Sequence, residues 1–107
     1  MTNNQAWCDE LKSAADALGE QTWQLPMHAE FAEQIKGEVA DIKNVGNGRW
    51  GGAMTAAKFL EEFVAGKPWV HMDIAGPAFL ERAKPYLDAG ASGAYVRTLV
   101  AMAENWK

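Results

Sequence analysis

The stretch "GAMTAAKFLEEFVAGKPWVHMDIAG", residues 52–76, decides the fold class. Its first half, 52–64, places small and apolar residues three or four positions apart, which predicts an amphipathic helix. The buried face of that helix is predicted to contain Ala53, Ala56, Ala57, Leu60 and Val64. The exposed face is predicted to contain Thr55, Lys58, Glu61 and Glu62. Its second half, 67–76, predicts a strand with Pro68 at its edge and Gly76 at its end. A helix that leads into a strand favours an α/β fold.

The flanking sequence predicts more helix than strand. Residues 3–20 carry an apolar face, with Asn3 or Asn4 as a possible cap and Gly19 as the stop. That face consists of Trp7, Leu11, Ala14 and Leu18. A short helix is expected between 28 and 37, and the connection from 79 to 93 shows little periodicity.

A closing helix is predicted in residues 94–107, with Ser92 as a possible cap. Its inward positions are predicted to be Val96, Leu99, Val100 and Ala103. The sequence predicts one strand, 67–76, or two at most, and a lone strand cannot satisfy its backbone groups. We expect the rest of the sheet to lie in chain beyond this sequence; pairing with a second copy is the alternative.

Composition limits the possible classes of protein. The chain has 107 residues, 49% hydrophobic and 22% charged, with a net charge of −4, which fits one soluble globular segment. Neither a nucleic-acid partner nor a membrane partner is expected from this charge and hydropathy. The single cysteine, Cys8, excludes an internal disulfide, so we predict a buried thiol in a cytoplasmic protein. The dispersed tryptophans are interpreted as packing or interface anchors: Trp7, Trp23, Trp50, Trp69 and Trp106.

Two polar features are candidates for chemistry. His71 and Asp73 share one face of the predicted strand, a spacing used by metal sites and acid/base pairs. Two ligands are too few for a metal site, so we interpret both residues as partners of neighbouring groups. The glycine-rich loop 46–52 precedes a helix but lacks the Gly-Lys-Ser/Thr of a phosphate-binding loop. It is interpreted as a close-packed turn.

Five segments, taken in order, carry a resemblance to a known family. They are Trp-x-Leu-Pro at 23–26, Ala-Asp-x-x-Asn at 40–44, Gly-Gly-Ala-x-Thr-Ala at 51–56, His-x-Asp-Ile-Ala-Gly at 71–76, and "GASGAYVRTLV" at 90–100. The series resembles the C-terminal third of the catalytic domain of leucyl (cytosol) aminopeptidases. In the last segment the family often has Arg-Pro after the second glycine, where this chain has Ala94-Tyr95.

The resemblance implies a metallopeptidase that removes N-terminal residues, often leucine, from peptides. The family uses two divalent cations, commonly zinc, manganese or magnesium, and forms a homohexamer. The fold expected from it is the helix-rich C-terminal part of a larger mixed-sheet metallopeptidase domain. The family's metal-binding signature, Asn-Thr-Asp-Ala-Glu-Gly-Arg, is absent from residues 1–107 and precedes this region in the family. We therefore expect a fragment in which Met1 corresponds to an internal position.

The resemblance also assigns roles to particular residues. Residues 1–107 are expected to supply core packing, oligomer contacts and part of the substrate side-chain pocket, and to contact the rest of the catalytic domain. Ala75 would form one wall of that pocket beside Gly76, and Ala78 would lie near another wall. No catalytic residue and no metal ligand is expected in this chain, which alone would be inactive. The alternatives are a free-standing non-catalytic interaction module and, more remotely, a small metal protein that uses His71 and Asp73.

Overall fold

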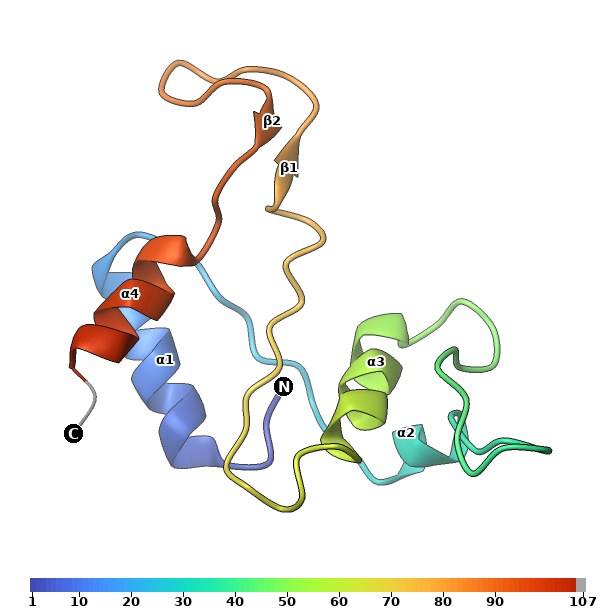
Figure 1. Ribbon diagram of the computed structural model, residues 1–107. Coiled ribbons are helices and arrows are strands. Elements are labelled where there is room, and N and C mark those ends of the chain that lie inside the picture. Colours follow the sequence, from blue (N-terminus) through green and yellow to red (C-terminus); the bar gives the residue numbers. More distant parts are fainter. Residues whose placement is uncertain (106–107) are drawn as a thin grey trace. The chain divides into compact units, whose positions relative to one another are not determined.

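The computed structural model describes residues 1–105, which form two compact units. Unit 1 comprises Met1–Cys8 and Trp23–His71, and unit 2 comprises Asp9–Thr22 and the chain from Met72 onward. Figure 1 shows the elements in chain order: α1 (Gln5–Ala17), α2 (Glu30–Glu33), α3 (Gly52–Glu61), β1 (Phe79–Leu80), β2 (Gly90–Ala91) and α4 (Val96–Glu104). This mixture of helix and sheet confirms the predicted α/β class. Trp106 lies outside the described residues, so its predicted role stays a prediction.

Helix α1 begins and ends where its local signals predict. The Asn4 Oδ1 accepts a hydrogen bond from the Trp7 N–H at 3.0 Å, which caps the first turn. Gly19 takes a left-handed conformation at φ 71°, and the Glu20 N–H reaches the Ala15 carbonyl at 2.9 Å. This pattern is a Schellman motif. Cys8, 3% exposed, lies on the buried face, which confirms the prediction of a buried thiol.

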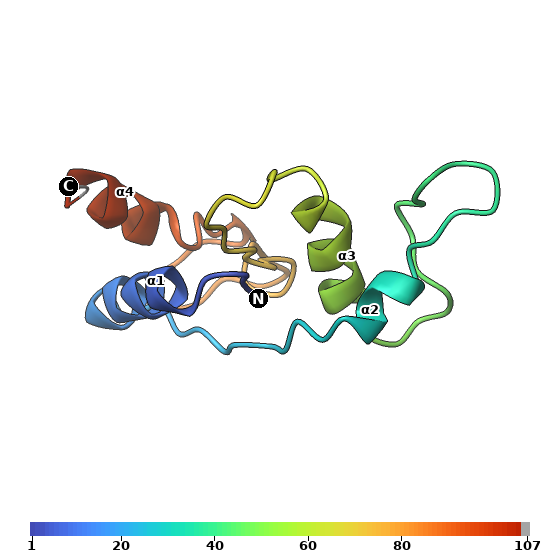
Figure 2. The same ribbon diagram turned by 90° about the horizontal axis from the view of Figure 1, so that it is seen from below.

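In unit 1, α2 packs against α3, as Figure 1 and Figure 2 both show. The predicted helix in 52–64 is confirmed as α3, but part of its predicted face is wrong. Thr55 and Ala57 are buried, whereas Ala56 and Leu60 are exposed. Thr55 tolerates burial because its hydroxyl donates to the Gly52 carbonyl at 3.0 Å and is therefore not left without a hydrogen-bond partner.

The segment 67–76 is not a strand, contrary to the prediction. Among the described residues its only ladder-type pairing is an isolated antiparallel bridge between Val70 and Thr2. Beside this bridge, the His71 N–H donates to the Met1 carbonyl at 2.9 Å. A strand needs a neighbour along its whole length, and residues 1–3 supply one only as far as His71.

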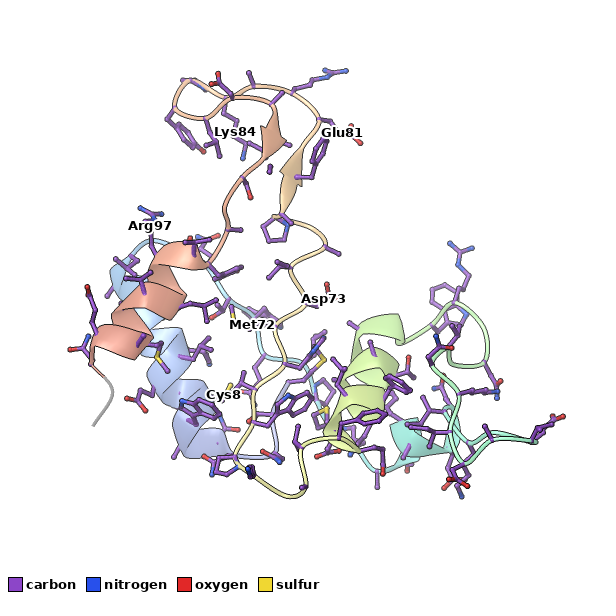
Figure 3. All side chains as sticks on the ribbon, viewed as in Figure 1. Cys8, Met72, Asp73, Glu81, Lys84 and Arg97 are labelled. Atoms are coloured by element: carbon purple, nitrogen blue, oxygen red, sulfur yellow. The ribbon has the colours of Figure 1, made fainter. Side chains whose placement is uncertain are left out.

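The sheet of unit 2 lies instead in the connection that was predicted to be irregular. Strands β1 and β2 pair antiparallel, with Phe79 opposite Ala91 and Leu80 opposite Gly90. Glu81 and Lys84 lie on the loop that joins the two strands (Figure 3). Each strand has only two residues, because the chain from residue 81 to residue 89 does not continue the pairing between them. This short hairpin directly follows the Ala75–Ala78 turn.

Helix α4 confirms the predicted closing helix, but its predicted inward face is wrong. Val96, Leu99 and Val100 are 57%, 56% and 51% exposed. Ala103, the fourth predicted position, is also exposed, whereas Thr98 is fully buried. The contacts of Thr98 with Glu20, described below, set the rotation of this helix.

Candidate functional site

A tight turn over residues 73–78 carries all the residues that were predicted to line a substrate pocket. The Ala78 N–H donates to the Ile74 carbonyl at 2.9 Å and closes the turn. The Asp73 Oδ1 accepts a hydrogen bond from the Ala75 N–H at 3.0 Å and holds its first residue. Figure 3 labels Asp73 at the start of this turn. The sequence thus folds back on itself here through two short local bonds.

The turn presents a face with little side chain. Ala75 and Gly76 are exposed, and Ala78 is half-buried. Apart from its chain neighbours Ala75 and Pro77, a Cβ added to Gly76 would meet no atom within 4 Å. Among the described residues, therefore, nothing beyond its immediate chain neighbours fills the space above Gly76.

Ser92, just after β2, attaches the far side of this turn. Its hydroxyl donates to the Pro77 carbonyl and accepts a hydrogen bond from the Ala94 N–H at 3.1 Å. Its own N–H donates to the Ala78 carbonyl at 2.9 Å. The predicted role of Ser92 as a side-chain cap of α4 is wrong, since α4 has no capping bond from its N-cap residue, Tyr95. Ser92 instead ties the 90–94 segment to the turn.

The N-terminus of α4 is capped by a carboxylate from a distant part of the chain. Glu20 Oε1 accepts from the Tyr95 N–H at 2.8 Å. Glu20 Oε2 accepts from the Thr98 N–H at 3.2 Å and from the Thr98 hydroxyl at 2.6 Å. A negative charge at this end of a helix also interacts favourably with the helix dipole. Glu20 therefore fixes both the position and the rotation of the first turn of α4.

These contacts alter the acidity of Glu20. The hydrogen bond from the Thr98 hydroxyl is the main cause that lowers the pKa of the Glu20 carboxyl below its usual value. Burial opposes the decrease, while the backbone N–H groups of Tyr95 and Thr98 and the charge of Arg97 add to it. Arg97, labelled in Figure 3, is 68% exposed and lies 3.8 Å from Glu20, so its contribution is small.

The Ala94-Tyr95 departure from the family pattern falls at a strained position. Tyr95 has a left-handed backbone with φ 62°, which is unfavourable for a residue with a side chain. Two contacts hold it there: its N–H donates to Glu20, and its hydroxyl donates to the Gln21 carbonyl. The residues that follow the Gly19 stop therefore support the turn that leads into α4.

The other candidate residues have structural contacts. Asp73 holds the Ala75 N–H, as interpreted from the sequence, and the His71 ring centroid lies 5.9 Å from that of Trp69. His71 belongs to unit 1 and Asp73 to unit 2. Within residues 1–105, no group of three or more His, Cys, Asp or Glu side chains is placed to hold a metal ion.

The glycine-rich loop 46–52 was interpreted as a close-packed turn, and its first residue, Gly46, is indeed closely packed. A Cβ on Gly46 would lie 3.2 Å from the Gln34 side-chain oxygen and 3.3 Å from Thr55. In the middle of the loop, the Arg49 guanidinium lies 5.4 Å from the ring centroid of Trp50, which is 80% exposed. Arg49 is thus engaged with its neighbour in the loop.

Reasoning from sequence missed the roles of Glu20 and Ser92. Glu20 directly follows a helix stop, and an acidic residue there carries no signal that it caps a helix 75 positions away. Ser92 stands between glycines at 90 and 93, so a local cap was the natural interpretation. The nearness of 77–78 to 92 depends on the β1–β2 pairing, which has no periodic signature in the sequence.

Comparison with known proteins identifies the family. The sequence model of the cytosol aminopeptidase family, catalytic domain, matches residues 1–100. The chain belongs to this family. A probable cytosol aminopeptidase of Rhodopirellula baltica is 63% identical over 105 residues, which are 98% of this chain and 21% of that protein. One of Solibacter usitatus is 51% identical over 105 residues, covering 98% of this chain and 22% of that protein.

Solved structures agree with this membership. A tomato leucine aminopeptidase mutant superimposes with a TM-score of 0.82 at 40% identity, covering 92% of this chain and 19% of that one. The cytosol aminopeptidase from Coxiella burnetii gives a TM-score of 0.86 at 29% identity, covering 99% of this chain and 23% of that one. The chain thus spans about a fifth of the length of its curated relatives. None of the helices in residues 1–105 has the length and apolar character to cross a membrane.

Proposed function

We propose that residues 1–107 are the C-terminal segment of the catalytic domain of a cytosol aminopeptidase, which hydrolyses N-terminal residues, often leucine, from peptides. The observation that carries this proposal is the 63% identity to a probable cytosol aminopeptidase over 98% of the chain. Identity of this degree, spread across the whole segment, also supports a similar position within the parent enzyme. A cytoplasmic location is part of the proposal, and the names of the relatives support it.

The segment contributes part of the pocket for the side chain of the substrate's N-terminal residue. Ala75, Gly76 and Ala78 form this part of the pocket. The exposed turn and the open space above Gly76 support the assignment. A branched side chain such as leucine needs a concave surface without bulk, and burial of its apolar area favours binding.

The segment also packs against the rest of the catalytic domain and contributes contacts within a homohexamer. Large apolar side chains that the described residues leave exposed support such contacts, among them Trp23 at 89% and Phe63 at 67%. Two divalent cations, of manganese, zinc or magnesium, belong to the intact enzyme. In this proposal the rest of the catalytic domain supplies the metal ligands and the reacting groups. The segment alone is expected to be inactive.

A chimera tests the proposal. In the Rhodopirellula baltica enzyme, the residues matched by this chain are replaced with this chain, and hydrolysis of leucine p-nitroanilide is measured. We expect kcat/KM within about tenfold of the parent, since most of the packing surface is shared. The same enzyme without the segment and the isolated 107-residue chain should both be inactive. A folded, metal-loaded chimera without activity would contradict the proposal and favour a non-catalytic interaction module.

Ala75→Phe in the active chimera tests the pocket. The added ring fills the space of a leucine side chain, so kcat/KM for leucine p-nitroanilide should fall by at least about tenfold. Metal content should not change, because Ala75 is not a metal ligand. Unchanged kinetics would remove Ala75 from the pocket.

A further inference from the structure

Ser92 holds two consecutive peptide groups of the turn that carries the proposed pocket. Its hydroxyl donates to the Pro77 carbonyl, and its N–H donates to the Ala78 carbonyl at 2.9 Å. Each bond orients one peptide plane. Together they set the direction of the chain on both sides of the Ala78 Cα.

The hydroxyl of Ser92 is itself fixed from its own side of the turn. It accepts a hydrogen bond from the Ala94 N–H at 3.1 Å through a lone pair, while its single hydrogen is donated to the Pro77 carbonyl. Ser92 is half-buried, whereas Ala75, Gly76 and Pro77 are exposed. The exposed turn has little packing of its own, so these hydrogen bonds carry much of its positional restraint.

The two ends of the turn are restrained differently. Its first half is held by local bonds, from the Ala75 N–H to Asp73 and from the Ala78 N–H to the Ile74 carbonyl. Its second half is held from outside, by Ser92, at a sequence distance of 15 residues. Loss of the Ser92 hydroxyl therefore leaves both backbone bonds of Ala78 in place but releases the Pro77 carbonyl, so the Pro77–Ala78 peptide group can rotate.

We propose that Ser92 is a positioning residue that sets the size of the side-chain pocket and thereby the selectivity of the enzyme for the N-terminal residue of its substrate. The inference rests on the proposed function, since it requires Ala75, Gly76 and Ala78 to line that pocket. Rotation of the Pro77–Ala78 peptide group re-aims the Ala78 methyl group and changes the volume offered to a leucine side chain. The chemistry at the scissile bond, which is supplied from elsewhere, is untouched.

The test compares variants of the active chimera on p-nitroanilides of leucine, alanine and phenylalanine. Ser92→Ala should lower the leucine-to-alanine ratio of kcat/KM by roughly three- to tenfold, the equivalent of one hydrogen bond. The change should appear mainly in KM for leucine, with kcat for alanine retained. Ser92→Thr keeps the hydroxyl and should restore the ratio. Ser92→Cys, which keeps only a weak donor, replaces Ser92→Ala if that variant does not fold.

Thr98→Val is the matched control. It removes another hydroxyl of unit 2, at the Glu20 contact, and should lower the melting temperature without a change in the leucine-to-alanine ratio. If Ser92→Ala leaves the leucine-to-alanine ratio within twofold of the parent while Ala75→Phe changes it, the role of Ser92 is refuted. The assignment of Ala75 to the pocket is then retained. If Ala75→Phe also leaves the ratio unchanged, the pocket assignment fails, and the inference fails with it. A ratio that Thr98→Val shifts as much as Ser92→Ala would also refute a specific role.

Discussion

Glu20→Gln should loosen the N-terminus of α4 by at least about 2 kcal/mol. The two carboxylate oxygens of Glu20 serve different donors: Oε1 serves Tyr95, and Oε2 serves Thr98. Glutamine has one acceptor oxygen, so one set of donors faces an amide nitrogen instead. The loss of a hydrogen bond to a charged acceptor costs about 1.5–3 kcal/mol, and the charge at the helix terminus adds about 0.3–1 kcal/mol. The Glu20 side chain is only 11% exposed, so hydrogen bonds from water would replace few of the lost interactions.

Native-state hydrogen exchange measured by NMR provides the assay, because it reports local opening of α4. The Thr98 N–H should exchange at least about 30-fold faster in Glu20→Gln, as 1.4 kcal/mol corresponds to a factor of ten. Glu10→Gln, at an exposed position of α1, is the matched control and should change exchange by less than about twofold.

The pH dependence has a definite sign. Because the pKa of Glu20 is lowered in the folded chain, its ionised form stabilises the fold. That stabilisation is fully present above the usual carboxyl pKa of about 4.3 and is lost as the pH falls through the lowered pKa of the folded state. The difference between the parent and Glu20→Gln should therefore be constant from neutral pH to about 4.3 and shrink below it. Equal exchange rates in both chains at neutral pH would refute the assigned cap.

Two further predictions concern unit 1, and urea denaturation followed by circular dichroism checks both. Gly37→Ala would place a Cβ 2.0 Å from the Ala40 carbonyl oxygen, so the free energy of unfolding should fall by about 2–3 kcal/mol; a loss below about 0.5 kcal/mol would contradict the close approach. Ala65→Gly should raise it by about 0.5 kcal/mol, because φ 51° at Ala65 costs about 1 kcal/mol and the added freedom of the unfolded chain offsets part of the gain. The control Ala56→Gly, at an exposed position within α3, should instead lower the free energy of unfolding by about 1 kcal/mol. If Ala65→Gly also lowered the free energy of unfolding, that result would argue against strain at Ala65.

The parts of the fold that the sequence predicts well depend on local signals. Helix α1 has its cap at Asn4 and its stop at Gly19, and both act within a few residues of the helix ends. The predicted end of the 67–76 segment at Gly76 likewise coincides with the chain reversal at residues 75–78. In these places propensity and tertiary structure agree.

The errors arise where a distant residue decides the outcome. The apolar pattern of α4 predicted an inward face of Val96, Leu99 and Val100, but a carboxylate 78 positions from Thr98 sets the rotation. The segment 67–76 has the composition of a strand, but composition describes the environment of side chains and does not supply a pairing partner. For the proposed site, the sequence itself shows the small side chains at Ala75 and Gly76, while their role comes from the family resemblance. The Ser92 contacts could not be predicted from the sequence, because they require the hairpin to be formed first.

The Glu20 cap has a consequence for the order of events during synthesis. Unit 2 is discontinuous in sequence, and Thr98 is added to the growing chain 78 residues after Glu20. At typical elongation rates this is an interval of about 4–16 s. Throughout it, α1 can form and stop at Gly19, while the Glu20 carboxylate stays hydrated. Unit 2 is therefore assembled only near the end of this segment, after all of unit 1 has been translated.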